Sequence, residues 1–462
     1  MQKLKMTRYW RLFISLILML SLLGGCTQDE AEVITSQESR AVVQTASSVK
    51  MVTSVQINEK GNMTPPMHLQ NRTDLEEANQ MELDYLESIG YKSKAYGYPI
   101  VDTGQDTFYN ESRIIHAPSE GDAFYGQDAT YTGNAPSYVD NGDGTITDLV
   151  TGLMWQQDPG EKMTWQEAMA GADSFELAGY DDWRLPTIKE LYSLINFKGE
   201  TGESAQTSVP YLDSQYFNFT YGDVTGERFI DSQYATSTIY ESTTFENNTT
   251  MFGVNFADGR IKGYPVDGKD FYVMYVRGNT SYGVNQFVDN GDGTITDYAT
   301  GLMWMKYDSG AMDFVEALKW SEDLDYAGYD DWRLPNVKEL QSIVDYSKSP
   351  DTTDSAAISD LFQVTQVTAI NGEMDYPYFW SSTTHLDGRE KYSNAAYVSF
   401  GEALGYMNNQ FMDVHGAGAQ RSDPKVDTAS EYPSYGNGPQ GDVRMVENYV
   451  RAVRSVDLDA LK

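Results

Sequence analysis

The chain has 462 residues and a formal net charge of -35, with 68 acidic residues against 33 Lys and Arg. Because a charge of this size repels polyanions at long range, we expect no nucleic-acid partner and disfavour sulfated polyanions as ligands. The single cysteine, Cys26, cannot form an internal disulfide, so the fold depends on burial and hydrogen bonds.

The first 25 residues have the layout of a secretory signal. Basic residues precede the apolar run Leu12 to Leu23, which ends shortly before Cys26. The stretch resembles a bacterial lipoprotein signal, whose cleavage leaves a cysteine that carries the lipid. The resemblance implies that Cys26 is the lipidation site and that the protein is exported and held by its lipid anchor at the outer membrane or cell surface. An ordinary signal or an uncleaved anchor is the alternative.

Residues 26–95 differ in composition from the rest of the chain. Ser, Thr, Gln, Asn and Glu dominate, Pro65 and Pro66 interrupt the segment, and only Leu75 to Ile89 has weak helical spacing. This composition is typical of a flexible linker. We therefore expect a tether that holds the folded part away from the membrane.

Two motifs then occur twice at the same offset along the chain. The run Asp140 to Asp148 returns as Asp289 to Asp297, and Asp182 to Pro186 returns as Asp331 to Pro335. A repeat of this length is typical of a duplicated domain. We expect a first module at 96–283, which includes an N-terminal extension, and a second at 284–462, each closing its own core.

The elements follow in the same order in both modules. Short β-favouring runs flank a turn rich in Gly and Asp, which predicts a β-hairpin at the start of each module. Two helix starts follow, each with a capping residue and a Glu three positions later. These capping residues are Thr164 and Thr187 in the first module and Asp313 and Asn336 in the second.

The remainder of each module is strand-like. Strands are expected at 234–238, 252–256 and 272–276 in the first module, and at 378–383, 396–400 and 449–453 in the second. The extra length of the second module lies mostly in the loop Gly401 to Asn448. Because long ordered loops commonly carry function, we expect module-specific function there.

Each copy contains Asp-Asn-Gly-Asp-Gly-Thr, then Thr-Gly-Leu-Met-Trp, then Ala-Gly-Tyr-Asp-Asp-Trp-Arg-Leu-Pro, and finally Tyr-Val-Arg. In this order the motifs resemble the C-terminal domain family of the Legionella collagen-like adhesin, over roughly residues 96–457. The resemblance implies an α+β fold of two tandem C-type-lectin-like modules, each with two short helices beside antiparallel sheet. Many family members carry a cysteine pair whose positions here are Ala172 and Gly278 in the first copy and Ser321 and Ala452 in the second.

Six aspartates of the hairpin regions offer oxygen ligands suited to Ca²⁺, the one cofactor that the sequence suggests. They are Asp140, Asp143 and Asp148 in the first module and Asp289, Asp292 and Asp297 in the second. Their order lacks the pattern of an EF-hand. We favour the alternative, in which Gly supplies positive φ and Asp accepts hydrogen bonds from nearby amides of the turn.

The candidate ligand-binding residues are aromatic residues and histidines of the second module. Tyrosines in loops suit an exposed recognition surface. The two histidines could meet, although solvated loop histidines are the simpler interpretation. The candidates are Tyr376, Tyr378, His385, His415, Tyr432 and Tyr435.

Three tryptophans could stack on a sugar or serve the core. We expect Trp183 and Trp332 to be buried anchors, each followed by an Arg that pairs with an acidic neighbour, and Trp380 to lie in a core strand. No Ser-His-Asp order or nucleophile elbow is visible, so we expect no enzyme.

The sequence leaves two functions open. We favour a surface-anchored binding or adhesion protein that recognises glycan or protein through its modules, because the chain combines an anchor, a tether and a duplicated module. The alternative is a metal-dependent envelope enzyme or enzyme accessory with its site in the long loop of the second module.

Overall fold

The computed structural model describes residues 97–388, 390–426 and 434–457, together with 56–57, 63–64 and 87–89. The expected signal, Cys26 and most of the expected tether therefore lie outside the described residues. Within the described ranges, no helix combines the length and the apolar character that crossing a membrane requires.

The elements of the first module and its extension, in chain order, are β1 (Gln56–Ile57), β2 (Met63–Thr64), β3 (Phe108–Tyr109), β4 (Ile114–Ile115), η1 (Asp128–Thr130), β5 (Tyr138–Asp140), β6 (Thr145–Asp148), β7 (Leu153–Gln156), β8 (Met163–Thr164), α2 (Trp165–Ala172), α3 (Ile188–Tyr192), η2 (Ala205–Thr207), β9 (Gln233–Tyr234), β10 (Ile239–Thr244), β11 (Asn248–Asn255), β12 (Arg260–Pro265), β13 (Asp270–Phe271) and β14 (Val276–Gly278). Those of the second module are β15 (Phe287–Asp289), β16 (Thr294–Asp297), β17 (Leu302–Met305), α4 (Phe314–Glu322), α5 (Val337–Ser342), α6 (Pro350–Thr353), β18 (Val367–Thr368), β19 (Met374–Asp375), β20 (Tyr378–His385), β21 (Asn394–Ser399), β22 (Leu404–Met407), β23 (Gln410–Asp413), β24 (Gln420–Pro424) and β25 (Val453–Ser455). The described chain is mostly antiparallel sheet with short helices, as an α+β class predicts.

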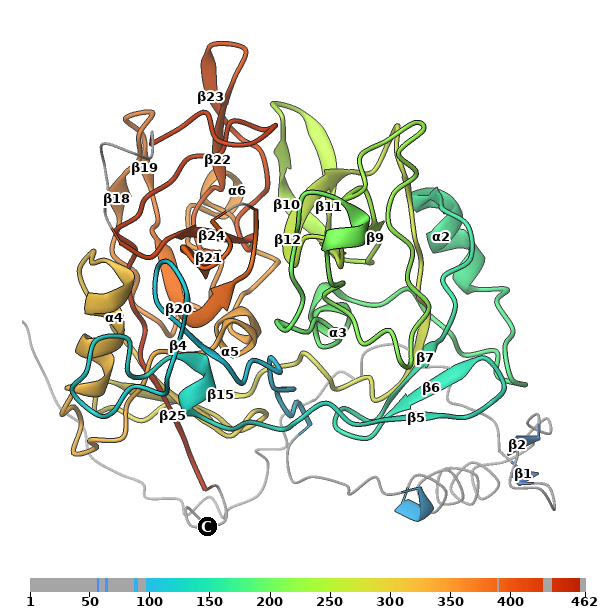
Figure 1. Cartoon of the computed structure of the whole chain (residues 1–462), viewed down its shortest axis with the longest axis horizontal. Coiled ribbons are helices and arrows are strands. Elements are labelled where there is room, and N and C mark those ends of the chain that lie inside the picture. The colour runs from blue at the N-terminus through green and yellow to red at the C-terminus, as the bar shows by residue number, and fades with distance from the viewer. Residues whose placement is uncertain are drawn as a thin grey trace, which may run out of the picture. The chain divides into compact units, whose positions relative to one another are not determined.

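Each module contains a small antiparallel sheet built on the predicted hairpin. The strand order is β14-β7-β6-β5 in the first module and β15-β16-β17-β25 in the second. Gly142 and Gly144 have φ of 73° and 90°, a region that glycine enters without steric cost, which explains the Gly-rich turn. The hairpin prediction is confirmed in both copies (Figure 1).

The predicted helix starts are also confirmed. Thr164 and Thr187 accept hydrogen bonds from the amides of Glu167 and Glu190, and both form complete capping boxes. Asp313 and Asn336 likewise accept hydrogen bonds from amides in the first turns of α4 and α5. These caps satisfy amides that the first turn of a helix leaves unpaired, so a local sequence signal sets where each helix begins.

The tryptophans are core anchors, as predicted. Trp183, Trp332 and Trp380 are 4%, 1% and 0% exposed. Arg333 forms a bidentate pair with Glu339, with both nitrogen–oxygen distances at 2.6 Å. The equivalent pair in the first module, Arg184 with Glu190, has the same distances. Since Glu190 and Glu339 also belong to the capping region, each pair fixes its helix to the preceding strand-like segment.

Three of the strand predictions are confirmed and three are largely wrong. Strands β11, β20 and β21 cover most of 252–256, 378–383 and 396–400. The segments 234–238, 272–276 and 449–453, however, each contribute a single residue to a strand. Isolated bridges, such as the one between Tyr234 and Tyr272, occur in these segments instead. In these segments the β-favouring residues therefore form isolated bridges and not a regular strand ladder.

The two modules share one sheet. Seven strands form a sheet whose main path runs β10-β11-β12-β24-β21-β20, with β9 paired to β11. The modules join where β12 and β24 pair antiparallel, with Ile261 opposite Gln420. The largest buried apolar cluster contains residues of both modules, including Phe252 and Val398. The expectation that each module closes its own core is therefore wrong.

The packing between the modules is reciprocal. Lys189 on α3 donates to the carbonyl oxygen of Ser342 at 2.8 Å, and Lys338 on α5 donates to the carbonyl oxygen of Ser193 at 2.9 Å. These lysines and serines occupy equivalent positions in the repeat. Such an exchange, in which a patch on each unit contacts the same patch on the other, is typical of a two-fold dimer. The chain thus resembles a symmetric dimer joined into one polypeptide.

The N-terminal extension of the first module packs on the second module. The side chain of Gln105 exchanges two hydrogen bonds of 2.9 Å with the backbone of Thr384. The buried carboxyl of Asp128 accepts hydrogen bonds from Thr103 and Thr383 at 2.8 and 2.5 Å. The N-terminal extension therefore ties the beginning of the folded part to β20, the strand of the second module at the end of the shared sheet.

Candidate functional site

The long loop of the second module builds a projecting hairpin. Strands β22 and β23 pair with Tyr406 opposite Phe411 and are joined by Asn408 and Asn409. Both asparagines have positive φ, 53° and 66°, which a two-residue hairpin turn requires and which Asn tolerates better than most residues. The hairpin stands out at the upper edge of the molecule in Figure 1.

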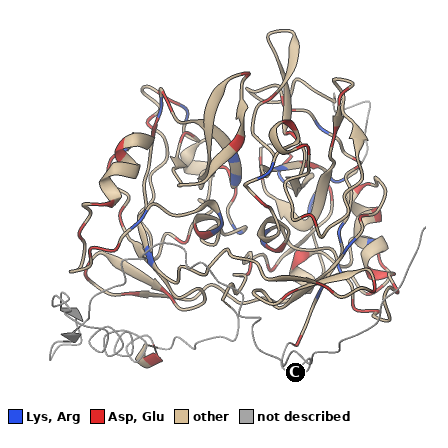
Figure 2. Ribbon diagram, turned by 180° about the vertical axis from the view of Figure 1, so that it is seen from behind, with Lys and Arg blue, Asp and Glu red and all other residues tan. Residues whose placement is uncertain are grey.

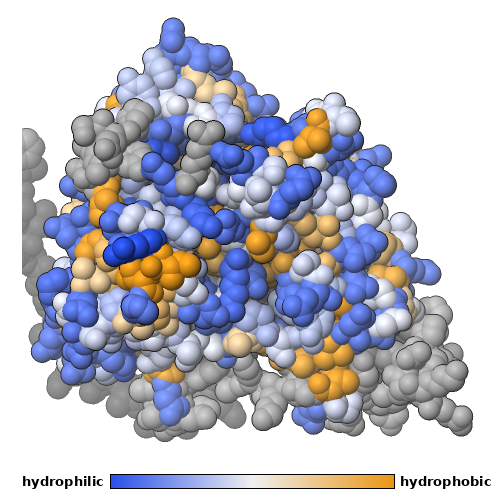
Figure 3. Space-filling view, in the orientation of Figure 1, coloured by the Kyte–Doolittle hydropathy of each residue, from blue (hydrophilic) through white to orange (hydrophobic). Residues whose placement is uncertain are grey.

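Three aromatic rings gather at this hairpin. The centroids of Tyr406 and Phe411 lie 4.9 Å apart, and Tyr435 lies 4.9 and 5.2 Å from them. Tyr435 is 43% exposed, and the other two are half-buried. We call these residues the aromatic triad. In the space-filling view, hydrophilic residues cap the projecting end, and more apolar ones lie beneath it (Figure 3).

A buried ionic network holds the segment that carries Tyr435. The carboxylate of Asp442 contacts Nε2 of His415 at 2.9 Å and also pairs with the guanidinium of Arg421. Burial, followed by the nearby Arg421, lowers the pKa of His415 to about 4, so this imidazole is neutral at pH 7. Although burial opposes it, the attraction of Arg421 and His415 lowers the pKa of Asp442. A charged hydrogen-bonded network of this kind pins a loop to a strand.

The first module supports the hairpin from the other side. The hydroxyl of Tyr240 on β10 donates to Oδ2 of Asp413 at 2.8 Å, and the amide of Phe245 donates to the carbonyl oxygen of Asp413 at 2.9 Å. Gln410 also pairs with Glu246 at the tip of the β10–β11 hairpin. The projecting surface is thus held by both modules.

Carboxyl groups crowd together below the hairpin. Burial, followed by the charges of Asp413, Asp351 and Asp375, raises the pKa of Glu402 to about 9. Burial also raises the pKa of Asp413 to about 7 and that of Asp375 to about 6. At neutral pH the cluster therefore keeps part of its protons, which limits repulsion between its members.

Glu402 gives a testable pH dependence. Its pKa is higher in the folded state than its ordinary value of 4.5, so its stabilising effect is complete below about 4.5 and is lost as the pH rises through about 9. The variant Glu402→Gln stays neutral, so its melting temperature relative to the native chain should rise with pH across this window. Thermal denaturation followed by circular dichroism at several pH values measures this difference. A difference that does not change with pH would contradict the prediction.

The tyrosines selected from the sequence have different environments. Tyr435 belongs to the aromatic triad, and Tyr432 lies outside the described residues. Tyr376 is half-buried, and its hydroxyl contacts Gln366 and the carbonyl oxygen of Asp354, both at 3.3 Å. Tyr378 is only 4% exposed and stacks on a neighbouring tyrosine. The expectation of an exposed Tyr378 is wrong, because its strand faces the core.

The two histidines are buried rather than solvated. Nε2 of His385 contacts the carbonyl oxygen of Asp258 at 2.9 Å, whereas His415 contacts Asp442. Burial lowers the pKa of His385 to about 3. They therefore serve separate contacts and form no pair. Among the described residues, no group of three or more His, Cys, Asp or Glu side chains is placed to hold a metal ion.

The acidic turns use their carboxylates locally. Oδ1 of Asp143 accepts from the amide and hydroxyl of Thr145 at 3.1 and 2.6 Å, and Oδ1 of Asp140 accepts from the amide of Gly142 at 2.8 Å. Asp289 and Asp292 repeat these bonds in the second module. Asp148 and Asp297 are buried at strand ends. This geometry matches the turn interpretation and lends no support to Ca²⁺.

Tyr406 and Phe411 are absent from the residues selected by sequence. The signal was present, since a two-residue Asn-Asn turn between apolar and aromatic residues predicts a hairpin. It also places the two rings directly opposite each other. The clustering with Tyr435 depends on a tertiary contact, because the amide of Tyr406 donates to the carbonyl oxygen of Gly441 at 2.8 Å.

The architecture defines a protein of two tandem α+β modules joined through a common antiparallel sheet. A model of the Lcl C-terminal domain family matches residues 144–277 and 293–416, which together make up more than half of the chain. The chain belongs to this family. No curated protein and no solved structure matches the chain. The second match ends inside the long loop, so it includes Tyr406 and Phe411, whereas Tyr435 and Asp442 lie beyond the matched region.

Proposed function

We propose that this protein is a lipid-anchored adhesin-like binding protein of the outer membrane or cell surface, which recognises glycan or protein through the aromatic triad of its second module. Membership of the Lcl C-terminal domain family supports an adhesin-like role. The C-type-lectin-like character that the family resemblance implies is part of the same proposal. The aromatic triad carries the proposal, because exposed aromatic rings on a supported loop are typical of recognition surfaces.

The position of the hairpin also supports display away from a membrane. The folded part begins beside the small sheet of the second module, where the amide of Tyr98 donates to the carbonyl oxygen of Ala299. The hairpin projects from the opposite edge (Figure 1). A tether attached at residue 97 would therefore leave the aromatic triad facing outward.

The charge distribution limits the class of ligand. In Figure 2, Asp and Glu are spread over the loops of both modules, while Lys and Arg include residues of the strands where the modules meet. Because the 68 acidic residues outnumber the 33 basic ones about twofold, the surface field is negative. Neutral glycans and basic or apolar protein surfaces are the ligands that this field favours.

Binding by the aromatic triad is tested with the full chain on a glycan array and against candidate surface proteins. Tyr435→Ala and Phe411→Ala should each weaken saturable binding by about tenfold or more, since central aromatic residues commonly dominate binding energy. Tyr307→Ala is the matched control, because Tyr307 is 50% exposed in the same module but lies outside the triad. EDTA should leave binding unchanged.

Two outcomes would contradict the proposal. One is saturable binding that Tyr435→Ala and Phe411→Ala both retain unchanged. The other is metal-dependent conversion of a bound compound, which would favour the enzyme alternative.

A further inference from the structure

The strongest unassigned chemistry lies at the junction between the modules, around Lys189. Its amino group donates not only to Ser342 but also to Oδ1 of Asn285, at 2.8 Å. Asn285 lies in the segment that connects the two modules. Its Nδ2 donates in turn to Oδ2 of Asp297, also at 2.8 Å. The amine of Lys189, the carboxamide of Asn285 and the carboxylate of Asp297 therefore form a continuous chain of hydrogen-bonded groups.

We propose that Lys189 and Asn285 form an intramolecular isopeptide bond, with Asp297 as the acid and base. The hydrogen bond from Lys189 already places its Nζ next to the carbonyl group that an amine attacks. Asp297 touches Nδ2, the nitrogen that has to leave. This is the arrangement that acyl transfer from a carboxamide to an amine needs.

The reaction balances without any further reactant. Neutral Nζ of Lys189 attacks Cγ of Asn285 and forms the Nζ–Cγ bond. Asp297 receives a proton released by the amine and returns it to Nδ2, so that the Cγ–Nδ2 bond breaks and ammonia leaves. No atom changes its oxidation state, and Asp297 ends the reaction as it began.

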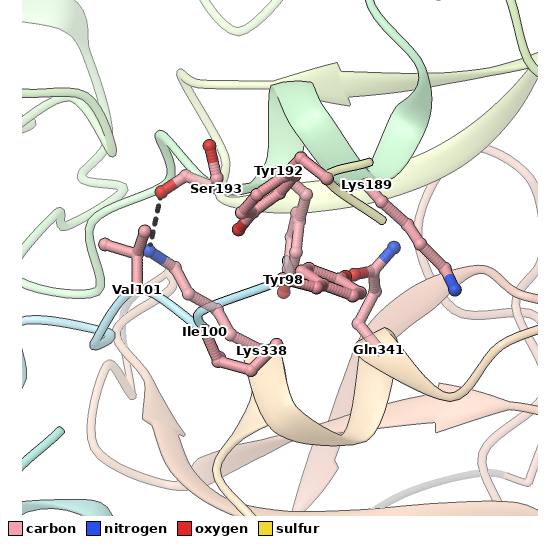
Figure 4. Close-up of a pocket in the computed structure, with 9 residues that line it drawn as sticks. Tyr98, Ile100, Val101, Lys189, Tyr192, Ser193, Lys338 and Gln341 are labelled. Carbon is pink, nitrogen blue, oxygen red and sulfur yellow. Dashed lines mark hydrogen bonds between the residues drawn. The ribbon is translucent and has the colours of Figure 1, made fainter. Parts of the chain in front are cut away.

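The surroundings favour each step. Burial lowers the pKa of Lys189 to about 8, so a useful fraction of the amine is unprotonated near neutral pH. Lys189 lines a cavity of about 10 Å³ with Tyr98 and Tyr192, which leaves room for about one water molecule. Figure 4 shows the amino groups of Lys189 and Lys338 on opposite sides of these tyrosines. This aromatic environment disfavours the charged form of the amine.

Asp297 is held in place for this role. Its Oδ1 accepts from the amides of Gln286 and Ala299 at 2.8 and 3.0 Å, and its Oδ2 accepts from the hydroxyl of Thr300 at 2.9 Å. The side chain is fully buried. The carboxylate is thus fixed by neighbours that do not take part in the reaction, with Oδ2 directed at Asn285.

The equivalent site in the first module supplies an internal comparison. There, Pro136 replaces Asn285, and Lys338 donates to the backbone carbonyl oxygens of Asp102 and Ser193 instead of to a carboxamide. Oδ2 of Asp148, the counterpart of Asp297, has no hydrogen-bond partner in the described structure. The repeat therefore provides the lysine and the aspartate twice but the reactive carboxamide once.

The bond would join α3 of the first module to the connection that leads into the second. It would close a loop over about half of the first module and lock the reciprocal contact between α3 and α5. A chain with one cysteine has no disulfide to do this, and a covalent closure of a long loop restricts the unfolded state in the same manner.

The bond is detected by mass spectrometry of the full chain after digestion with trypsin. An isopeptide blocks cleavage at Lys189, so we expect one branched peptide made of 185–198 and 278–306. Its mass should be lower by one ammonia than the sum of the two linear peptides, and its fragments should place the branch at Lys189 and Asn285. Recovery of the two regions only as linear peptides would overturn the proposal.

Variants separate the isopeptide from other losses of ammonia. Asn285→Ser and Lys189→Arg should each abolish the branched peptide. Asn290→Ser, which removes another carboxamide from the same tryptic peptide, should retain it and also removes an Asn-Gly site prone to cyclisation. A branch that persists without Asn285 or Lys189 would refute the assignment. If either Asn285→Ser or Lys189→Arg does not fold, the other variant still tests whether the branch depends on these two residues.

Discussion

Replacing Asp442 with Asn should lower the free energy of unfolding by about 3–5 kcal/mol, because removal of one partner leaves a buried charge without its counterion. Arg421 and Asp442 have side chains that are only 10% and 16% exposed. His415, which is neutral at pH 7, cannot supply a negative charge to Arg421 in place of Asp442. The variant should therefore lose the network that holds the segment around Tyr435 to His415 and to Arg421 of β24.

The measurement is urea-induced unfolding of residues 97–462, compared with a matched pair at the surface. Asp331→Asn breaks an Arg–Asp pair with Arg454, but Asp331 is 55% exposed. We expect a loss of less than about 1 kcal/mol there, because solvent screens an exposed pair. Equal losses for the two variants would show that Asp442 is not the buried anchor we describe. Asp442→Asn should also weaken ligand binding, since Tyr435 loses its support.

Separation of the modules should abolish folding of the first one. A fragment of residues 97–283 lacks β24, which covers the edge of β12, and lacks the second module's share of the largest apolar cluster. It also removes Thr383, one of the two donors to the buried carboxyl of Asp128, and the backbone of Thr384, with which the side chain of Gln105 exchanges two hydrogen bonds. Exposed apolar surface and unpaired buried groups are both costly, so no cooperative fold is expected.

The fragment is compared with residues 97–462 by near-ultraviolet circular dichroism and thermal denaturation. We expect a single cooperative transition for the longer chain and a gradual change, with binding of a hydrophobic dye, for the fragment. A sharp transition with a near-native aromatic signal in the fragment would mean that the first module is an autonomous domain.

The sequence predicted well those features that depend on neighbouring residues. The caps at Thr187 and Asn336, the hairpin turns and the burial of Trp183 and Trp332 follow from short motifs, because a capping hydroxyl or a turn glycine acts within a few residues. The repeat itself identified two like modules and the family to which they belong.

Only the tertiary structure decided how the modules combine. The pairing of β12 with β24, the exchange between Lys189 and Lys338, and the contact of Asn285 with Asp297 join residues far apart in the chain or at irregular spacing. No local pattern encodes such partners, because burial and strand pairing depend on what the rest of the chain leaves uncovered. For the same reason His385 and His415, for which the sequence favours solvated loops, are buried in the folded chain, where they contact residues far away in the sequence.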